Sequence, residues 1–153
     1  MAKDQICKRI NMSLFFKSED LRLTALRVLE IKLKSNGIKF KQIPGKRRIH
    51  YKIIKANREF NTVVFSADGE CLKIYKCHEY IKPFFIFIWY VYENPTFYIL
   101  TYNDVRRLFG PKPFETFSWK EEGYYSWSSA TGVPSQRKHI LDTFYKNNWG
   151  ILK

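Results

Sequence analysis

Hydrophobic residues in the first part of the chain recur at the spacing of a helix. Over residues 19–36, three leucines fall on one helical face, which predicts a helix with that face buried. These leucines are Leu26, Leu29 and Leu33. Ser18 is the predicted N-cap residue and Gly37 the predicted end of the helix. Residues 1–17, which precede this helix, are predicted to form an N-terminal arm.

The period then changes to the two-residue alternation of a strand. Residues 38–42 and 49–53 alternate between apolar and mainly cationic positions on either side of Pro44-Gly45. This pattern predicts a β-hairpin with one apolar and one cationic face. Four further apolar stretches predict strands at 62–66, 72–76, 84–92 and 96–100. Asp68-Gly69 is the predicted turn between the first two, and the third is apolar throughout, as in a strand buried on both faces.

Two helices and a long loop complete the predicted order. Thr101 caps a short helix, Asp104 fits a capping box three residues later, and Gly110-Pro111 ends the helix. Residues 111–134 are predicted to form a loop rich in aromatic residues, and residues 136–148 an amphipathic helix. Its predicted inward residues are Leu141, Phe144 and Tyr145. The pattern therefore predicts one α/β (or α+β) domain, with strands between flanking helices.

Composition adds a strong positive charge to this picture. The 153 residues are enough for one domain with a hydrophobic core, and they include 27 Lys and Arg against 14 Asp and Glu. The resulting formal charge of +13 favours binding to polyanions such as nucleic acid, although it is also compatible with a role in solubility alone.

The cysteines and the N-terminal residues predict a cytoplasmic protein. Cys7, Cys71 and Cys77 have no disulfide-framework spacing, which favours a reducing compartment. Cys77 and His78 lack a second pair of zinc ligands at finger-like spacing, so no metal site is predicted there. The first residues lack a signal-peptide core, and residues 84–92 are too short to span a membrane.

The order of the predicted elements resembles the restriction-endonuclease-like fold of the PD-(D/E)XK superfamily. Within it, a small family of uncharacterised bacterial domains has segments similar to residues 68–109 and to the tryptophan-bearing stretch at residues 145–152. The resemblance implies a mixed central β-sheet flanked by helices over residues 18–153. It also implies DNA cleavage with Mg²⁺, which takes hard oxygen ligands and activates a bound water. Such enzymes use an aspartate on one strand, a glutamate or glutamine and a lysine on the next, and often a glutamate on the first helix.

The residues at the corresponding positions of this chain carry none of that chemistry. The aspartate position falls on Lys52, the paired positions on Val63 and Phe65, and the helix glutamate near Leu26. The resemblance therefore implies a degenerate site, with no catalytic residue and no cofactor. In another register, an active Mg²⁺-dependent site would use Asp68, Glu70 and Lys73, with Glu59 nearby. Against this register, Asp-Gly is typical of a turn and would place these residues around a loop.

The most specific feature of the sequence is a basic run. Between Ile31 and Arg58 there are ten Lys and Arg and no acidic residue. The predicted nucleic-acid-binding residues are Lys39, Lys41, Lys46, Arg47, Arg48, His50, Lys52, Lys55 and Arg58. The alternative is a solvated face without a partner. If six such cations neutralised phosphates of a duplex, log K would fall with log salt at a slope of about −5.

The aromatic residues of the predicted loop allow two interpretations. They are Phe114, Phe117, Trp119, Tyr124, Tyr125 and Trp127. Aromatic rings among lysines can stack unpaired bases, but such rings more often hold a long loop against the sheet. Arg106 and Arg107 either extend the basic surface or suit the end of their helix.

The sequence thus favours a non-catalytic nucleic-acid-binding domain whose partner is double-stranded DNA and whose basic hairpin contacts phosphates. One alternative is an active Mg²⁺-dependent endonuclease with displaced catalytic residues. Another is a protein-interaction subunit of a defence or restriction complex, in which an acidic partner covers the basic face. No membrane partner is predicted, and a homodimer remains open because many nucleases of this fold are dimers.

Overall fold

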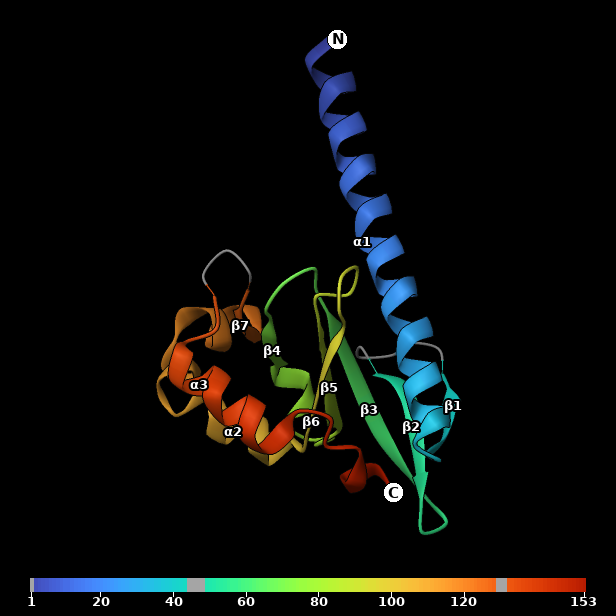
Figure 1. The fold of residues 1–153 in the computed structure, drawn as a ribbon. Coiled ribbons are helices and arrows are strands. Elements are labelled where there is room, and N and C mark those ends of the chain that lie inside the picture. The colour runs from blue at the N-terminus through green and yellow to red at the C-terminus, as the bar shows by residue number, and fades with distance from the viewer. Residues whose placement is uncertain (1, 44–48, 129–131) are drawn as a thin grey trace.

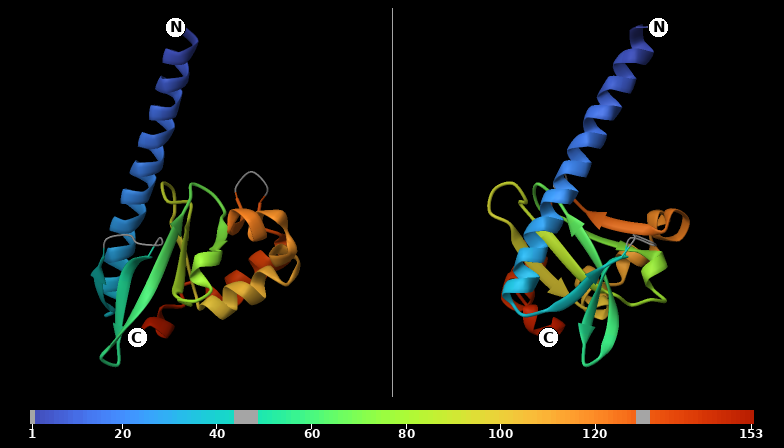
Figure 2. Two further views of the ribbon diagram at one scale, coloured as in Figure 1. Left: turned by 180° about the vertical axis from the view of Figure 1, so that it is seen from behind. Right: turned by 90° about the vertical axis from the view of Figure 1, so that its right-hand side faces the viewer.

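The computed structural model describes residues 2–43, 49–128 and 132–153. A five-stranded sheet forms the middle layer, with helix α1 on one face and α2 and α3 on the other (Figures 1 and 2). Its strands, in spatial order, are β1 (Lys39–Gln42), β2 (Ile49–Lys55), β3 (Arg58–Ser66), β5 (Phe84–Trp89) and β6 (Thr96–Leu100). This arrangement confirms the predicted α/β class with a mixed sheet flanked by helices.

The sheet is mixed because only one neighbouring pair is parallel. β1, β2 and β3 form an antiparallel meander, β5 runs parallel to β3, and β6 runs antiparallel to β5. The uninterrupted apolar sequence of β5 suits this position, since every residue from Phe85 to Trp89 is buried. The prediction of a strand covered on both faces is confirmed.

The two strands on either side of the predicted turn at Asp68-Gly69 are present, but they do not pair with each other. β4 (Leu72–Tyr75) leaves the main sheet and pairs antiparallel with β7 (Tyr124–Trp127) in a separate two-stranded sheet. β5 takes the place beside β3 because it can be buried on both faces, whereas Lys73 and Tyr75 of β4 are only half-buried. The segment around Asp68 is therefore a connection between two sheets.

Helix α1 (Ala2–Ser35) begins earlier than predicted. The predicted N-cap at Ser18 is wrong, because helix already begins at Ala2, whereas the predicted N-terminal arm over residues 1–17 stays a prediction. The physical reason is that no proline or glycine precedes Gly37, so nothing in the sequence interrupts the helix. The first half of α1 extends beyond the sheet, whereas its second half lies along it (Figure 1).

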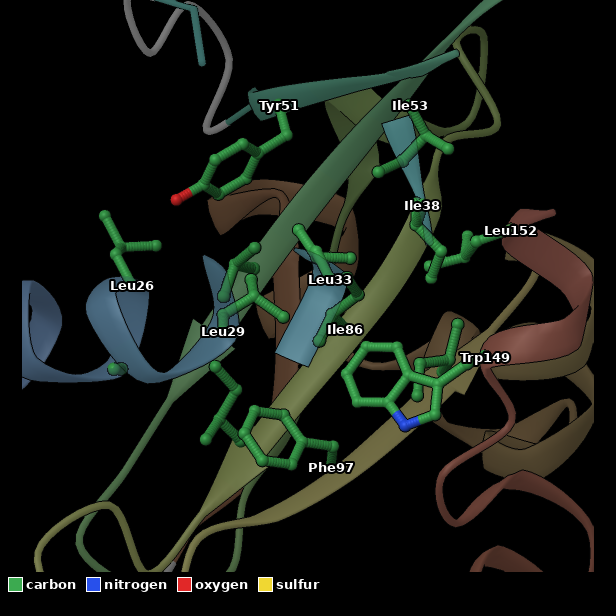
Figure 3. Close-up of a cluster of buried hydrophobic side chains, with 14 of the residues drawn as sticks. Leu26, Leu29, Leu33, Ile38, Tyr51, Ile53, Ile86, Phe97, Trp149 and Leu152 are labelled. Carbon is green, nitrogen blue, oxygen red and sulfur yellow. The ribbon is translucent and has the colours of Figure 1, made fainter. Parts of the chain in front are cut away.

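Two hydrophobic clusters fill the spaces on either side of the sheet. In the first, the predicted leucines of α1 pack against β2, β5, β6 and the C-terminal 3₁₀-helix Trp149–Leu152 (Figure 3). Leu29 and Leu33 are fully buried there, which confirms the predicted inward face of α1. In the second cluster, β4, β7 and α2 cover the opposite face of β5 and β6. Among the described residues, no helix is both long and apolar enough to cross a membrane.

Helix α2 (Tyr102–Phe109) has the predicted ends. Thr101 and Asp104 form both hydrogen bonds of a capping box, and Gly110 follows with a φ of 78°. The predicted loop contains regular structure instead: a 3₁₀-helix at Lys112–Glu115, a π-helix at Ser118–Glu122, and β7.

The C-terminal helix is shorter than predicted and differs in its inward face. It consists of α3 (Ser135–Ile140) followed by a π-helical segment, Leu141–Tyr145. Leu141 is buried as predicted, but the side chain of Phe144 is 67% exposed, so its predicted inward position is wrong. The π-helical turn changes the angular spacing of side chains, and helical periodicity cannot anticipate that change.

Candidate nucleic-acid interface

Three of the predicted lysines lie on one face of the β1–β2 hairpin. Lys41 and Lys52 are direct cross-strand partners, and Lys39 lies two residues from Lys41 on β1. Tyr51 and Ile53 belong to the cluster under α1, so strand alternation directs the three lysines to the opposite face. We call Lys39, Lys41 and Lys52 the lysine face.

An acid from β3 lies within the lysine face. Glu59 accepts a salt bridge from Lys41 at 2.5 Å and another from Lys52 at 3.3 Å. The hydrogen bond from Lys41, followed by that from Lys52, lowers the pKa of the Glu59 carboxyl. The basic run ends at Arg58, and the next residue is Glu59. The β2–β3 hairpin therefore places this acid against lysines from the middle of the run.

The other predicted cations have different positions. The Nζ of Lys55 donates a hydrogen bond to the carbonyl of Ile151 at 2.9 Å, so this lysine attaches β2 to the C-terminal segment. Arg58 is exposed at the start of β3, opposite Lys55. The predicted residues Lys46, Arg47 and Arg48 lie outside the described residues.

A cavity of about 390 Å³ opens where β3 ends and β4 begins. We call it the first cavity. Its cationic lining residues are Arg22 of α1 and Lys73 of β4, and His50 of β2 and Cys71 are its other titratable ones. Its hydroxyl groups come from Ser66, Ser126 and Ser128. The described lining contains no carboxylate, and Phe65 and Trp127 contribute aromatic walls.

A β-bulge positions His50 at the first cavity, and two tyrosine rings lie beside the ammonium of Lys73. Ile49 and Tyr51 oppose consecutive residues of β3, so His50 is the extra residue of a β-bulge. His50 Nδ1 accepts a hydrogen bond from the N–H of Val64 at 3.3 Å, which orients the ring. The ammonium of Lys73 lies over the rings of Tyr75 and Tyr124, at 5.1 and 5.3 Å from their centroids.

Arg22 reaches the first cavity from the second half of α1. Its guanidinium forms a 2.7 Å salt bridge with Glu19, one turn earlier on the helix. Arg22 and Glu19 are both substantially exposed, so the pair is open to water and the arginine keeps donors for an additional acceptor.

The positions that the nuclease resemblance assigns to metal ligands carry other interactions. Val63 is fully buried, and Leu26 packs in the cluster under α1. Phe65 stacks on Phe87 at 5.7 Å and on Tyr75 at 5.8 Å. None of these side chains carries an oxygen ligand, and the remaining position, Lys52, faces Glu59.

The alternative catalytic residues do not share one site. Glu70 accepts hydrogen bonds from Lys138 at 2.7 Å, the Tyr90 hydroxyl at 3.3 Å and the Val133 N–H at 3.4 Å. Burial raises the pKa of Glu70, but the bonds from Lys138 and Val133 outweigh it and the net pKa is lowered. Asp68 is exposed, whereas Lys73 points over tyrosine rings. Across the described parts of the chain, no three His, Cys, Asp or Glu side chains are placed to hold a metal ion.

Most aromatic residues of the predicted loop pack against α2. Trp119 is buried and meets Phe114 edge to face at 4.7 Å. The guanidinium of Arg106 lies 3.5 Å from the ring centroid of Phe114, so this arginine supports packing. Phe117 is 72% exposed and does not share in this packing role.

Sequence reasoning missed four residues of the first cavity: Arg22, Ser66, Ser126 and Ser128. The serines sit next to predicted or observed strand ends, and no local pattern distinguishes them from loop serines. Arg22 is a solvent-side helix residue by periodicity. Ser126 and Ser128 reach the cavity through the pairing of β4 with β7, which sequence periodicity does not reveal.

Comparisons with protein-family models, with curated proteins and with solved structures gave no match for this chain. The likeness to the restriction-endonuclease-like fold therefore stays a prediction.

Proposed function

We propose that this domain binds nucleic acid, with double-stranded DNA as the first candidate, and that it holds phosphates without cleaving them. The observation that carries the proposal is the first cavity, whose described lining joins Arg22, His50 and Lys73 to three serine hydroxyls without a carboxylate. Cations and hydroxyl donors are the groups that proteins use to contact phosphate oxygens.

The lysine face supports the same proposal. β2 contributes to both surfaces, because Lys52 lies on the lysine face and His50, two residues earlier, lines the first cavity. A nucleic-acid backbone bound along β2 would therefore meet cations at both the lysine face and the first cavity. The formal charge of +13 adds a long-range attraction for such a polyanion.

We also propose that the core is restriction-endonuclease-like. Support comes from the element order, in which a helix precedes an antiparallel meander and a parallel strand follows through a crossover. The positions of the metal ligands in such enzymes would then be Lys52, Val63, Phe65 and Leu26. Because none of these side chains can ligate Mg²⁺, the proposal includes no metal and no catalytic residue.

The test is fluorescence anisotropy with a labelled 20-base-pair duplex, measured over a salt series with EDTA or with Mg²⁺. If Arg22, Lys39 and Lys73 each neutralise one phosphate while Glu59 holds Lys41 and Lys52, log K falls with log salt at a slope of about −2.7. We expect Lys73→Ala to reduce this slope by about 0.9, and EDTA to have no effect. Lys146→Ala is the matched control, because Lys146 is an exposed lysine that bridges to β6, the edge strand opposite β1.

Three outcomes would contradict the proposal. Absent or salt-independent binding would exclude phosphate contacts as the basis of function. Cleavage of plasmid DNA that requires Mg²⁺ and is lost in Glu70→Ala would establish the endonuclease. Capture of an acidic protein that survives nuclease treatment, without binding to the duplex, would establish a protein-interaction subunit.

A further inference from the structure

A second cavity, of about 430 Å³, shares a wall with the first cavity. Trp127 lines both. The other aromatic walls of the second cavity are Phe109 and Tyr125, and its polar residues include Lys112, Gln136 and Arg137. The volume is within the range of small-molecule sites, which is about 300–1,000 Å³.

The aromatic wall of the second cavity is fixed before any ligand arrives. The ring of Phe109 lies 4.6 Å from Trp127 and meets Tyr125 edge to face at 5.6 Å. Phe109 is buried at the end of α2, whereas Trp127 and Tyr125 on β7 are only half-buried. These two rings therefore keep accessible surface in fixed positions, so placing a flat ligand against them costs little ordering entropy.

The polar rim of the second cavity is cationic and unpaired. Among the described residues, neither Lys112 nor Arg137 forms a salt bridge, and no carboxylate lines the cavity. The guanidinium of Arg137 lies beside Gly110, the residue that follows α2. A ligand that carries a flat ring and an anionic group would therefore find aromatic side chains for the ring and cations for the anion in the second cavity.

We infer that the second cavity takes the base of an unpaired nucleotide in the nucleic acid held by the first cavity. The base stacks on Trp127 and meets Tyr125 edge to face, because the planes of these two rings are 78° apart, and its phosphate faces Arg137 and Lys112. This inference rests on the proposed function and adds a substrate class to it: a strand with an unpaired nucleotide at an end, a flap or a bulge. Trp127 connects the two sites because the same side chain borders the phosphate site and the base site.

The test compares three duplexes that differ only at a single-nucleotide overhang: one with 2-aminopurine, one with an abasic nucleotide and one blunt-ended. We expect the 2-aminopurine duplex to bind about tenfold more tightly than the abasic one, since stacking on aromatic side chains is worth about this factor per base. Its fluorescence should be quenched on binding, whereas 2-aminopurine placed inside the blunt duplex should not change.

Two arginine variants assign the effect to the second cavity. Arg137→Ala should weaken binding to the overhang duplexes while leaving affinity for the blunt duplex unchanged, which also shows that the variant is folded. Arg107→Ala is the matched control, because Arg107 is an exposed arginine on α2 that does not line the second cavity. It should leave the 2-aminopurine preference intact.

Different experimental results would overturn this inference and the proposed function. Equal affinity for the 2-aminopurine and abasic overhangs, with no quenching, would overturn the base site while duplex binding continued. An equal loss of affinity for all three probes in Arg137→Ala would also overturn it. If none of the three probes bound to the unmodified protein, the proposed function itself would be overturned.

Discussion

Glu59 controls the charge of the lysine face. It pairs with Lys41 and Lys52 at 2.5 and 3.3 Å, and all three side chains are well exposed. Exposed pairs of this kind add little to stability, so the acid has a larger effect on what the face can bind than on how firmly it folds. A phosphate approaching these lysines must compete with the Glu59 carboxylate.

We therefore predict that Glu59→Gln strengthens nucleic-acid binding. Freeing two lysines should make the slope of log K against log salt steeper by about 0.9 to 1.8. The measurement is duplex anisotropy over a salt series. Glu93→Gln, at an exposed position in the turn between β5 and β6, is the charge-matched control. A slope that both variants change equally would show that only net charge matters.

Glu70 has a structural role that the sequence did not indicate. It receives hydrogen bonds from the Lys138 ammonium, the Tyr90 hydroxyl and the Val133 N–H, and so connects the β3–β4 segment to α3 and the residues before it. The second cavity is lined by residues of the same region, since Pro134 and Arg137 border it. Glu70 thus supports the walls of a candidate site.

Glu70 also gives stability a pH dependence with a defined sign. Its pKa is lowered in the folded protein from the ordinary value of 4.5. The ionised carboxylate therefore stabilises the fold fully above pH 4.5, and this stabilisation is lost as the pH falls below 4.5 through the folded-state pKa. We predict that Glu70→Gln lowers the free energy of unfolding at pH 7 by about 1–2 kcal/mol. The difference from the unmodified protein in urea unfolding should shrink toward pH 3. A constant difference across this range would contradict the ionic role.

At the scale of elements, the sequence predicted those helix ends and buried faces that depend on neighbouring residues in the chain. The capping box of Thr101 and Asp104 and the turn at Gly110 depend only on near neighbours, and all were predicted correctly. The burial of β5 on both faces followed from its uninterrupted apolar residues. The leucine face of α1 was correct for the same reason, although the start of the helix was not.

Elements that depend on distant partners were not predicted. β7 lies in a segment that has the composition of a loop, and it is a strand because β4 supplies its hydrogen-bonding partner. The first cavity was missed for the same reason, since Lys73 and Ser126 meet only across that pair. Lys39, Lys41 and Lys52 were predicted on one face because strand alternation is local, but the return of Glu59 to that face depends on the β2–β3 hairpin.

The turn between β2 and β3 offers a stability test at this scale. Ala56 and Asn57 connect the paired residues Lys55 and Arg58, and their φ values are 51° and 61°. Positive φ at both positions matches a type I′ turn, in which alanine is strained and asparagine is favoured. We predict that Ala56→Asn raises the free energy of unfolding by about 0.5–1 kcal/mol. Ala56→Val should lower it by about 1 kcal/mol, because a β-branched residue resists positive φ. Urea denaturation distinguishes these outcomes, and equal stability of the two variants would contradict the turn geometry.

For the whole molecule, the formal charge of +13 acts on folding and binding in opposite directions. Charges of one sign repel each other in the compact state and attract a polyanion. We predict that raising NaCl from 20 to 300 mM increases the midpoint of thermal unfolding while it weakens duplex binding, because salt screens both interactions. Differential scanning fluorimetry and anisotropy in the same buffers provide the measurements. A midpoint that falls with salt would show that attractive ion pairs outweigh the repulsion.

The late position of β7 in the chain has a consequence for biosynthesis. Residues of this strand line both cavities, and its partner β4 is made much earlier. A nascent polypeptide that has emerged from the ribosome only as far as Gly123 already contains all five strands of the main sheet but neither complete cavity. If the proposed function holds, products terminated before β7 would therefore bind nucleic acid poorly, because both cavities are complete only after this strand has been made.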